Sequence, residues 1–151
     1  MPTIHMYPGV KKKMLDLVME NDTEIGWYGI CDRRKDDIYV KDILVYPQID
    51  GDAHVTTRGL PEYDQWIIGL DNETVNHIRL AGHSHVKFDV KPSVTDRQDE
   101  LVTISQLGDD DYFLFLILNK DRDFDLRYYN GATGRFGELK GTMANESAQI
   151  H

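Results

Sequence analysis

The chain has 151 residues, of which 40% are hydrophobic and 28% are charged. A chain of this length and composition suits one compact soluble domain with a core of its own. No apolar run reaches the ~18 residues of a membrane span, and residues 1–10 lack the apolar segment of a signal peptide. We therefore expect a cytoplasmic protein with no membrane contact.

The charge and the cysteine content limit which partners and which metal ligands the chain can have. The formal net charge of −9 argues against nucleic acid as a partner, because phosphate backbones are bound by clustered Lys and Arg. Cys31 is the only cysteine, which excludes an internal disulfide and a thiolate-rich structural zinc site. Any metal ion would have to be held by His, Asp or Glu.

Hydrophobic periodicity and turn residues predict helices and strands in alternating groups. Helices are expected over Val10–Glu20, from Pro61 through Leu70, and from Ser93 to about Leu107. Strands are expected over Glu24–Cys31, Ile38–Tyr46, Val75–Gly82, Tyr112–Leu118 and Phe124–Tyr129, with a short strand considered at His54–Thr57. This order predicts an α/β fold, a mixed sandwich around one sheet. Gly, Ser and Asn dominate after Asn130, so we expect a domain over residues 1–130 and a flexible tail over residues 131–151.

Two histidines follow the third predicted strand and are separated by one residue. Because positions i and i+2 of an extended segment share a face, His83 and His85 can direct both imidazoles at one metal ion. Asp96 lies eleven residues further on, where the next helix begins, and the intervening loop can bring it back. Two histidines and one carboxylate leave a fourth tetrahedral position for water, which is the catalytic arrangement of zinc. The predicted metal ligands are His83, His85 and Asp96.

A metal-dependent hydrolase also needs a group that accepts a proton from water, and Glu24 is the candidate. It starts an otherwise apolar strand, where a carboxylate is costly unless it is paired or functional. Partial burial would raise its pKa toward the range that a general base requires. A surface position at the start of the strand is the alternative for this residue.

The spacing of these residues resembles a known family. His83-Ser84-His85, seven residues, Ser93, two residues and Asp96 form the His-x-His-x7-Ser-x2-Asp pattern of the JAMM metalloproteases, also called JAB or MPN-plus domains. The resemblance covers the chain from Glu24 to Leu118 and includes the upstream Glu before an apolar strand. Val86 departs from the pattern, since many members have Pro directly after the second His.

The resemblance implies a mixed α-β-α sandwich around a curved, mostly antiparallel sheet. It also implies one Zn²⁺ per chain on His83, His85 and Asp96, with Glu24 as general base and Ser93 helping to stabilise the oxyanion at the scissile carbonyl. Members cleave peptide or isopeptide bonds. The implied partner is a protein or peptide substrate, of which a ubiquitin-like or sulfur-carrier-type protein is one kind.

Several other interpretations fit parts of the pattern. Ser93 and Asp96 also satisfy a helix capping box, and both roles can hold together. A non-catalytic, metal-bound scaffold or protein-binding module of the same fold remains the alternative function. An amidohydrolase-type barrel is excluded because it needs about 250 residues. His54 and His77 have no partner at ligand spacing.

Overall fold

Seven strands form one sheet in the computed structural model, which describes residues 1–49, 57, 59–86 and 89–143. The elements in chain order are β1 (Thr3–Met6), α1 (Val10–Glu20), β2 (Gly26–Arg34), β3 (Asp37–Leu44), α2 (Pro61–Gly69), α3 (Asn72–Asn76), β4 (Ile78–His85), α4 (Val94–Ser105), β5 (Tyr112–Asn119), β6 (Asp123–Asn130) and β7 (Arg135–Thr142). The expected α/β class is confirmed.

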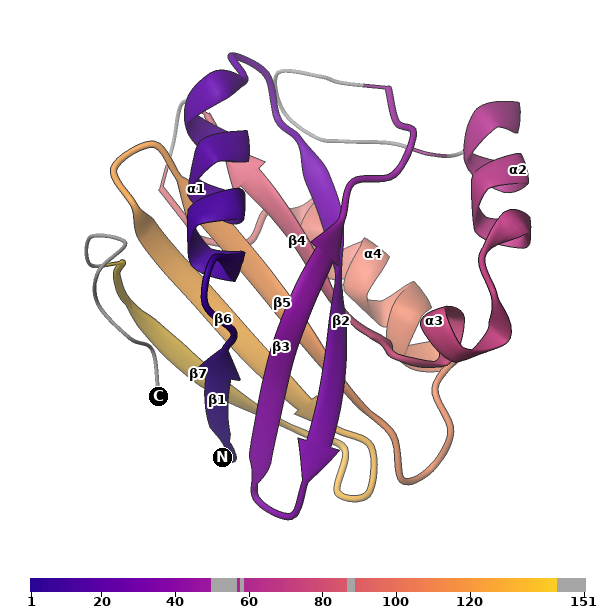
Figure 1. Ribbon diagram of the computed structural model, residues 1–151. Helices are drawn as coiled ribbons and strands as arrows, with labels where there is room; N and C mark the ends of the chain where they lie inside the picture. The colour runs from indigo at the N-terminus through magenta and orange to yellow at the C-terminus, as the bar shows by residue number, and fades with distance from the viewer. Residues whose placement is uncertain (50–56, 58, 87–88, 144–151) are drawn as a thin grey trace.

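The strand order in the sheet is β1-β3-β2-β4-β5-β6-β7. The pairs β1–β3 and β4–β5 are parallel, and the other four pairs are antiparallel. The sheet curls around α1 (Figure 1), so that its two ends approach each other. A methyl group added at Gly137 in β7 would lie 3.0 Å from Sδ of Met1, which precedes β1.

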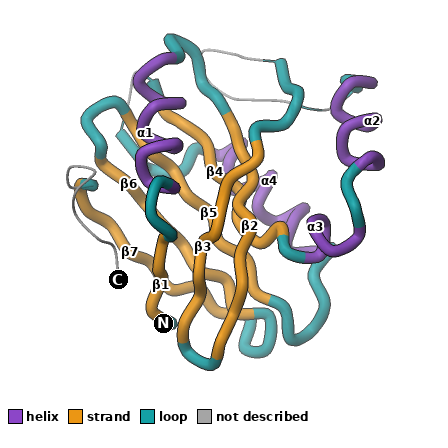
Figure 2. The backbone as a smooth tube through the Cα atoms, viewed as in Figure 1, coloured by secondary structure: helices purple, strands orange, loops and turns teal. Residues whose placement is uncertain are grey.

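The two faces of the sheet are covered by different helices, with α1 in front and α4 behind in the view of Figures 1 and 2. Helix α1 buries Val10, Met14 and Val18 in the hydrophobic core, where they join the inward side chains of the central strands. Strand β5 is buried on both faces: Leu114, Leu116 and Leu118 belong to this core, while Phe113, Phe115 and Ile117 alternate with them.

The structure differs from the sequence-based expectations in three places. Residues 135–142 form strand β7, which pairs with β6 along its whole length, so this part of the predicted tail is wrong; residues 144–151 lie outside the described part. Val75 and Asn76 belong to the short helix α3, and the following strand extends through both histidines. Strand β1 was not expected, because its four residues are too few for a clear alternation.

The short strand considered at His54–Thr57 falls almost entirely on residues that the structure does not describe. No helix within the described ranges is long and apolar enough to cross a membrane.

Candidate metal centre

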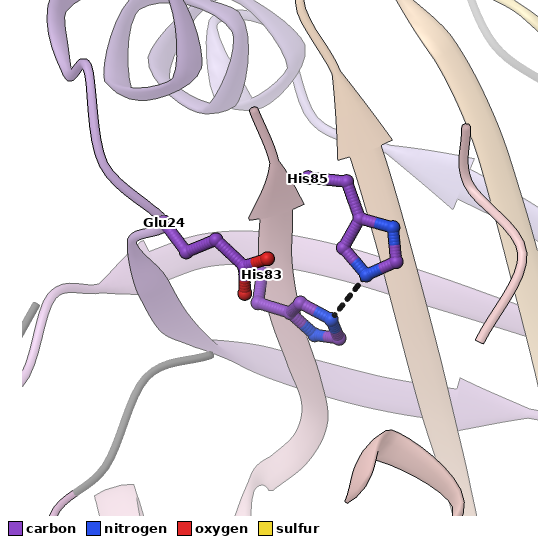
Figure 3. Close-up of side chains that lie close together, drawn as sticks. All are labelled: Glu24, His83 and His85. Atoms are coloured by element: carbon purple, nitrogen blue, oxygen red, sulfur yellow. Dashed lines mark hydrogen bonds between the residues drawn. The ribbon is translucent and has the colours of Figure 1, made fainter. Parts of the chain in front are cut away.

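Strand β4 supplies the two histidines at its C-terminal end. His83 and His85 occupy alternate positions of an extended strand, so both side chains project from the face that carries α4. Their Nε2 atoms lie 3.2 Å apart, and Figure 3 shows the two imidazoles turned toward each other. His85 is fully buried, while the side chain of His83 keeps 22% of its exposure. The pair therefore presents two nitrogen donors at one point, open to solvent on the His83 side.

Asp96 reaches this point from the first turn of α4. One carboxylate oxygen, Oδ1, lies 3.2 Å from Nε2 of His83, and the other, Oδ2, lies 3.1 Å from Nε2 of His85. Ser93 caps the helix: its Oγ accepts a hydrogen bond from the Asp96 N–H at 3.0 Å, and Asp96 Oδ2 accepts one from the Ser93 N–H at 2.9 Å. The capping box is confirmed, and it holds the Asp96 carboxylate in place beside the imidazoles.

Glu24 lies just before β2 and is brought to the site by the pairing of β2 with β4. Gly26 is directly opposite His83, so Glu24, two residues earlier, points from the same face of the sheet. The intervening Ile25 is tied to Ser84: its N–H donates to Ser84 Oγ at 2.9 Å, and its carbonyl accepts from the Ser84 N–H at 3.0 Å. The placement of Glu24 thus depends on the residue between the two histidines.

The Glu24 carboxylate is fully buried, and neither oxygen has a hydrogen-bond partner among the described residues. One donor atom each from Glu24, His83 and His85 all lie within 4.8 Å of one another. Figure 3 shows the Glu24 carboxylate directed toward the imidazoles. A buried carboxylate without a partner is expensive, and a cation at this point would relieve that cost.

The surroundings shift the pKa values of the two carboxylates, Glu24 and Asp96, in opposite directions. Burial raises the pKa of Glu24 to about 7, an effect that His85 opposes and Asp96 reinforces. The pKa of Asp96 is also pushed up by burial, but the hydrogen bonds of His83 and His85 outweigh this and hold it well below its usual range. Asp96 is therefore charged, and Glu24 can take up or release a proton near neutral pH.

His85 is held by a second contact that sequence analysis did not identify. Its Nδ1 donates a hydrogen bond to the backbone carbonyl of Asp89 at 2.5 Å. A carbonyl only accepts, so the proton of a neutral His85 sits on Nδ1 and the lone pair of Nε2 faces Asp96 and His83. Burial lowers the pKa of His85, but the hydrogen bonds to Asp96 and Asp89 outweigh this and raise it overall. No motif marks a backbone carbonyl as a partner, so only the fold reveals this contact.

Gly26 leaves room for an aromatic wall beside the site. The hydroxyl of Tyr46 would lie 2.1 Å from a methyl group added at Gly26, so a larger residue there would require the Tyr46 ring to shift. Tyr46 packs against Tyr28, with ring centroids 4.4 Å apart, and both rings contact Trp66 of α2. Tyr46 reaches Gly26, which lies opposite His83, and so brings this aromatic group to the histidine end of β4.

Other chemistry-bearing residues lie away from this cluster. His77 precedes β4, so it is at the opposite end of the strand from His83 and His85, and its Nδ1 contacts the Glu73 carbonyl at 2.7 Å. A polar cavity of about 250 Å³ at that end is lined by residues that include Cys31, Arg33, His77, Arg79 and Tyr112. His54 lies outside the described residues.

The donor set fits a metal ion. The two imidazole Nε2 atoms lie 3.2 Å apart, and each lies within 3.2 Å of one Asp96 oxygen. The buried Glu24 also has a donor atom within 4.8 Å of a ring nitrogen of each histidine, so Asp96 makes the closer contacts. Nitrogen and oxygen donors in this number are those that zinc takes in proteins. No protein-family model matches the sequence, and no curated protein is significantly similar to it.

Proposed function

We propose that the protein is a zinc-dependent hydrolase of the JAMM type that cleaves a peptide or isopeptide bond. The observation that carries the proposal is the convergence of the His83 and His85 Nε2 atoms on the Asp96 carboxylate at 3.1–3.2 Å. Beside them lies the buried Glu24, whose oxygens have no hydrogen-bond partner in the part of the chain that the structure describes. Zinc bound there would supply a Lewis acid that activates water and polarises the substrate carbonyl.

The residues of the chain divide the remaining work. His83, His85 and Asp96 would hold the metal, and the Asp89 carbonyl keeps Nε2 of His85 available as a ligand. Glu24 would accept a proton from water and pass it to the leaving amine, a role for which its pKa of about 7 is suited. Ser93 would donate its hydroxyl hydrogen to the oxyanion, since its Oγ acts only as an acceptor in the helix cap.

The substrate class follows from the family resemblance and from the site's surroundings. A ubiquitin-like or sulfur-carrier-type protein would place its extended C-terminal tail beside the open His83. The aromatic wall of Tyr28, Tyr46 and Trp66 offers apolar contact area next to that position. We therefore propose a protein tail rather than a small amide as the substrate.

The test combines metal analysis with a cleavage screen. The purified chain is loaded with zinc and incubated with fusion proteins whose junctions follow a Gly-Gly sequence, and products are identified by mass spectrometry. The proposal expects one zinc per chain and cleavage that Glu24→Gln abolishes without loss of zinc. Stoichiometric zinc with no cleavage in any fusion would favour the metal-bound scaffold, and cleavage by Glu24→Gln at the parental rate would reject Glu24 as the base.

A further inference from the structure

Helix α4 carries Asp96, one of the proposed ligands, and the residues that it buries most deeply are not apolar. Its buried residues are both acidic, Asp96 and Glu100, which lie one turn apart on the same side of the helix. Three of its four large apolar residues face solvent: Val94, Leu101 and Val102 are 74%, 65% and 57% exposed, while Ile104 is partly buried. The contacts of the two buried carboxylates therefore help to set the position of α4.

Glu100 makes a buried ion pair with Arg127 of β6. Nη2 of Arg127 donates a hydrogen bond to Oε2 of Glu100. Arg127 is 5% exposed and Glu100 is 8% exposed. Removing one partner of such a pair leaves an uncompensated buried charge, which makes the contact hard to break. Glu100 thus fixes α4 to β6 one helical turn beyond the point where Asp96 meets the histidines.

Arg127 is in turn held between two aromatic rings. Its guanidinium carbon lies 6.0 Å from the ring centroid of Phe115 in β5 and 6.0 Å from that of Phe136 in β7. In the sheet register Arg127 is opposite Phe115 on one side and Glu138 on the other. These contacts restrict where the guanidinium can sit, and with it the Glu100 carboxylate.

We propose that Glu100 and Arg127 are positioning residues for the metal centre: their ion pair sets α4 against the sheet so that Asp96 meets both imidazoles. The inference rests on the proposed metal site and adds residues that have no donor atom in it. Ser93 fixes the Asp96 side chain relative to its own helix, whereas the Glu100–Arg127 pair fixes that helix relative to β4 and β6. Strand β7 takes part through Phe136.

The test measures the zinc affinity of the whole 151-residue chain by competition with a chromophoric chelator. The free energy of unfolding in urea is measured for the same variants, so that effects on folding are seen separately. Glu100→Gln is expected to weaken zinc binding by about ten-fold or more, the effect usual for groups that orient metal ligands. In an Asp96→Asn background the same substitution is expected to change zinc affinity by less than about two-fold, because Glu100 acts through Asp96.

Two residues of β7 give a matched pair of milder variants. Phe136 and Leu139 are 48% and 46% exposed and lie on opposite faces of the strand. Phe136→Ala removes a ring from Arg127 and is expected to weaken zinc binding several-fold. Leu139→Ala, on the α1 face, is expected to leave zinc affinity unchanged.

The outcomes distinguish failure of the positioning role from failure of the proposed metal site. A parental chain that binds zinc while Glu100→Gln binds it equally well overturns the positioning role and leaves the proposed metal site intact. A loss of affinity that is equally large in the Asp96→Asn background, or equally large for Leu139→Ala and Phe136→Ala, also overturns it, since the effect would then be a general one on folding. A parental chain that binds no zinc overturns both proposals.

Discussion

Asp96 Oδ2 accepts a hydrogen bond from the Ser93 backbone N–H at 2.9 Å, and the same oxygen lies 3.1 Å from Nε2 of His85. One carboxylate therefore closes a helix cap and faces the histidine pair. This double contact explains why a capping box and a ligand motif coincide in the sequence. Ser93 therefore has a structural role in the cap, which can be measured apart from the catalytic role proposed for it.

Ser93→Ala is expected to destabilise the protein by about 1 kcal/mol, the usual cost of losing an N-cap side chain. The free energy of unfolding, measured in urea, checks this value. Ser105→Ala near the other end of α4 removes only an exposed hydrogen bond to the Val102 carbonyl and serves as the control. It is expected to change stability by less than ~0.5 kcal/mol. Equal losses for both variants would contradict the capping role.

Glu24→Gln is expected to stabilise the metal-free protein in a pH-dependent way. The pKa of Glu24 is raised to about 7 by burial, so the folded protein binds more protons than the unfolded chain between about pH 4.5 and 7. Stability therefore falls as pH rises through this window, and Gln removes that loss. The difference in unfolding free energy between variant and parent, measured with chelator present, should grow from pH 5 to pH 8. A constant difference would contradict a buried, unpaired carboxylate.

Zinc is expected to raise the melting temperature of the parental chain, since an ion that binds only the folded state stabilises it by about 2.7 kcal/mol at a hundred times its Kd. The shift should shrink as pH falls, because protons compete with the metal ion for its donor atoms, among them Nε2 of His85, whose pKa is raised by its hydrogen bonds to Asp96 and Asp89. His83→Ala should lose most of the shift. His77→Ala, at the far end of β4, should keep it. Equal shifts in the two variants would place the zinc elsewhere.

Cys31 is expected to be unreactive in the folded protein. Its side chain is 1% exposed, and burial raises the pKa of its thiol to about 12. Thiolate is the reactive form, so a disulfide reagent at pH 8 should modify less than about one tenth of the chains until denaturant is added. Rapid labelling under native conditions would show that the β2 region opens readily.

The clustering of the proposed ligands His83, His85 and Asp96 could be predicted from the sequence because most of its geometry is local. His83 and His85 share a face by strand periodicity, and the Ser93-to-Asp96 cap fixes the carboxylate on the first helical turn. Glu24 was predicted from its apolar context and a resemblance. Its actual placement depends on the β2–β4 register and on Ser84, which are long-range.

Contacts between distant segments could not be predicted in this way. The Asp89 carbonyl carries no side-chain signal, and Glu100–Arg127 joins a helix to a strand across 27 positions. Strand β7 was assigned to a tail because Gly, Ser and Asn dominate that part of the sequence, and its Gly137 and Gly141 weaken the strand pattern. Its side chains are mostly exposed in the structure. Pairing with β6, rather than burial, defines that strand.

X-ray absorption at the zinc edge of the reconstituted protein would observe the proposed donor set itself. Zinc on His83, His85 and Asp96 would show two imidazole nitrogens at about 2.0–2.1 Å and at least one carboxylate oxygen at about 2.0–2.2 Å, with no sulfur ligand. We expect His85→Ala to remove one imidazole from the spectrum and Glu100→Gln to keep both. A spectrum without paired imidazoles, or with the same imidazole content in His85→Ala as in the parental chain, would contradict the metal centre described here.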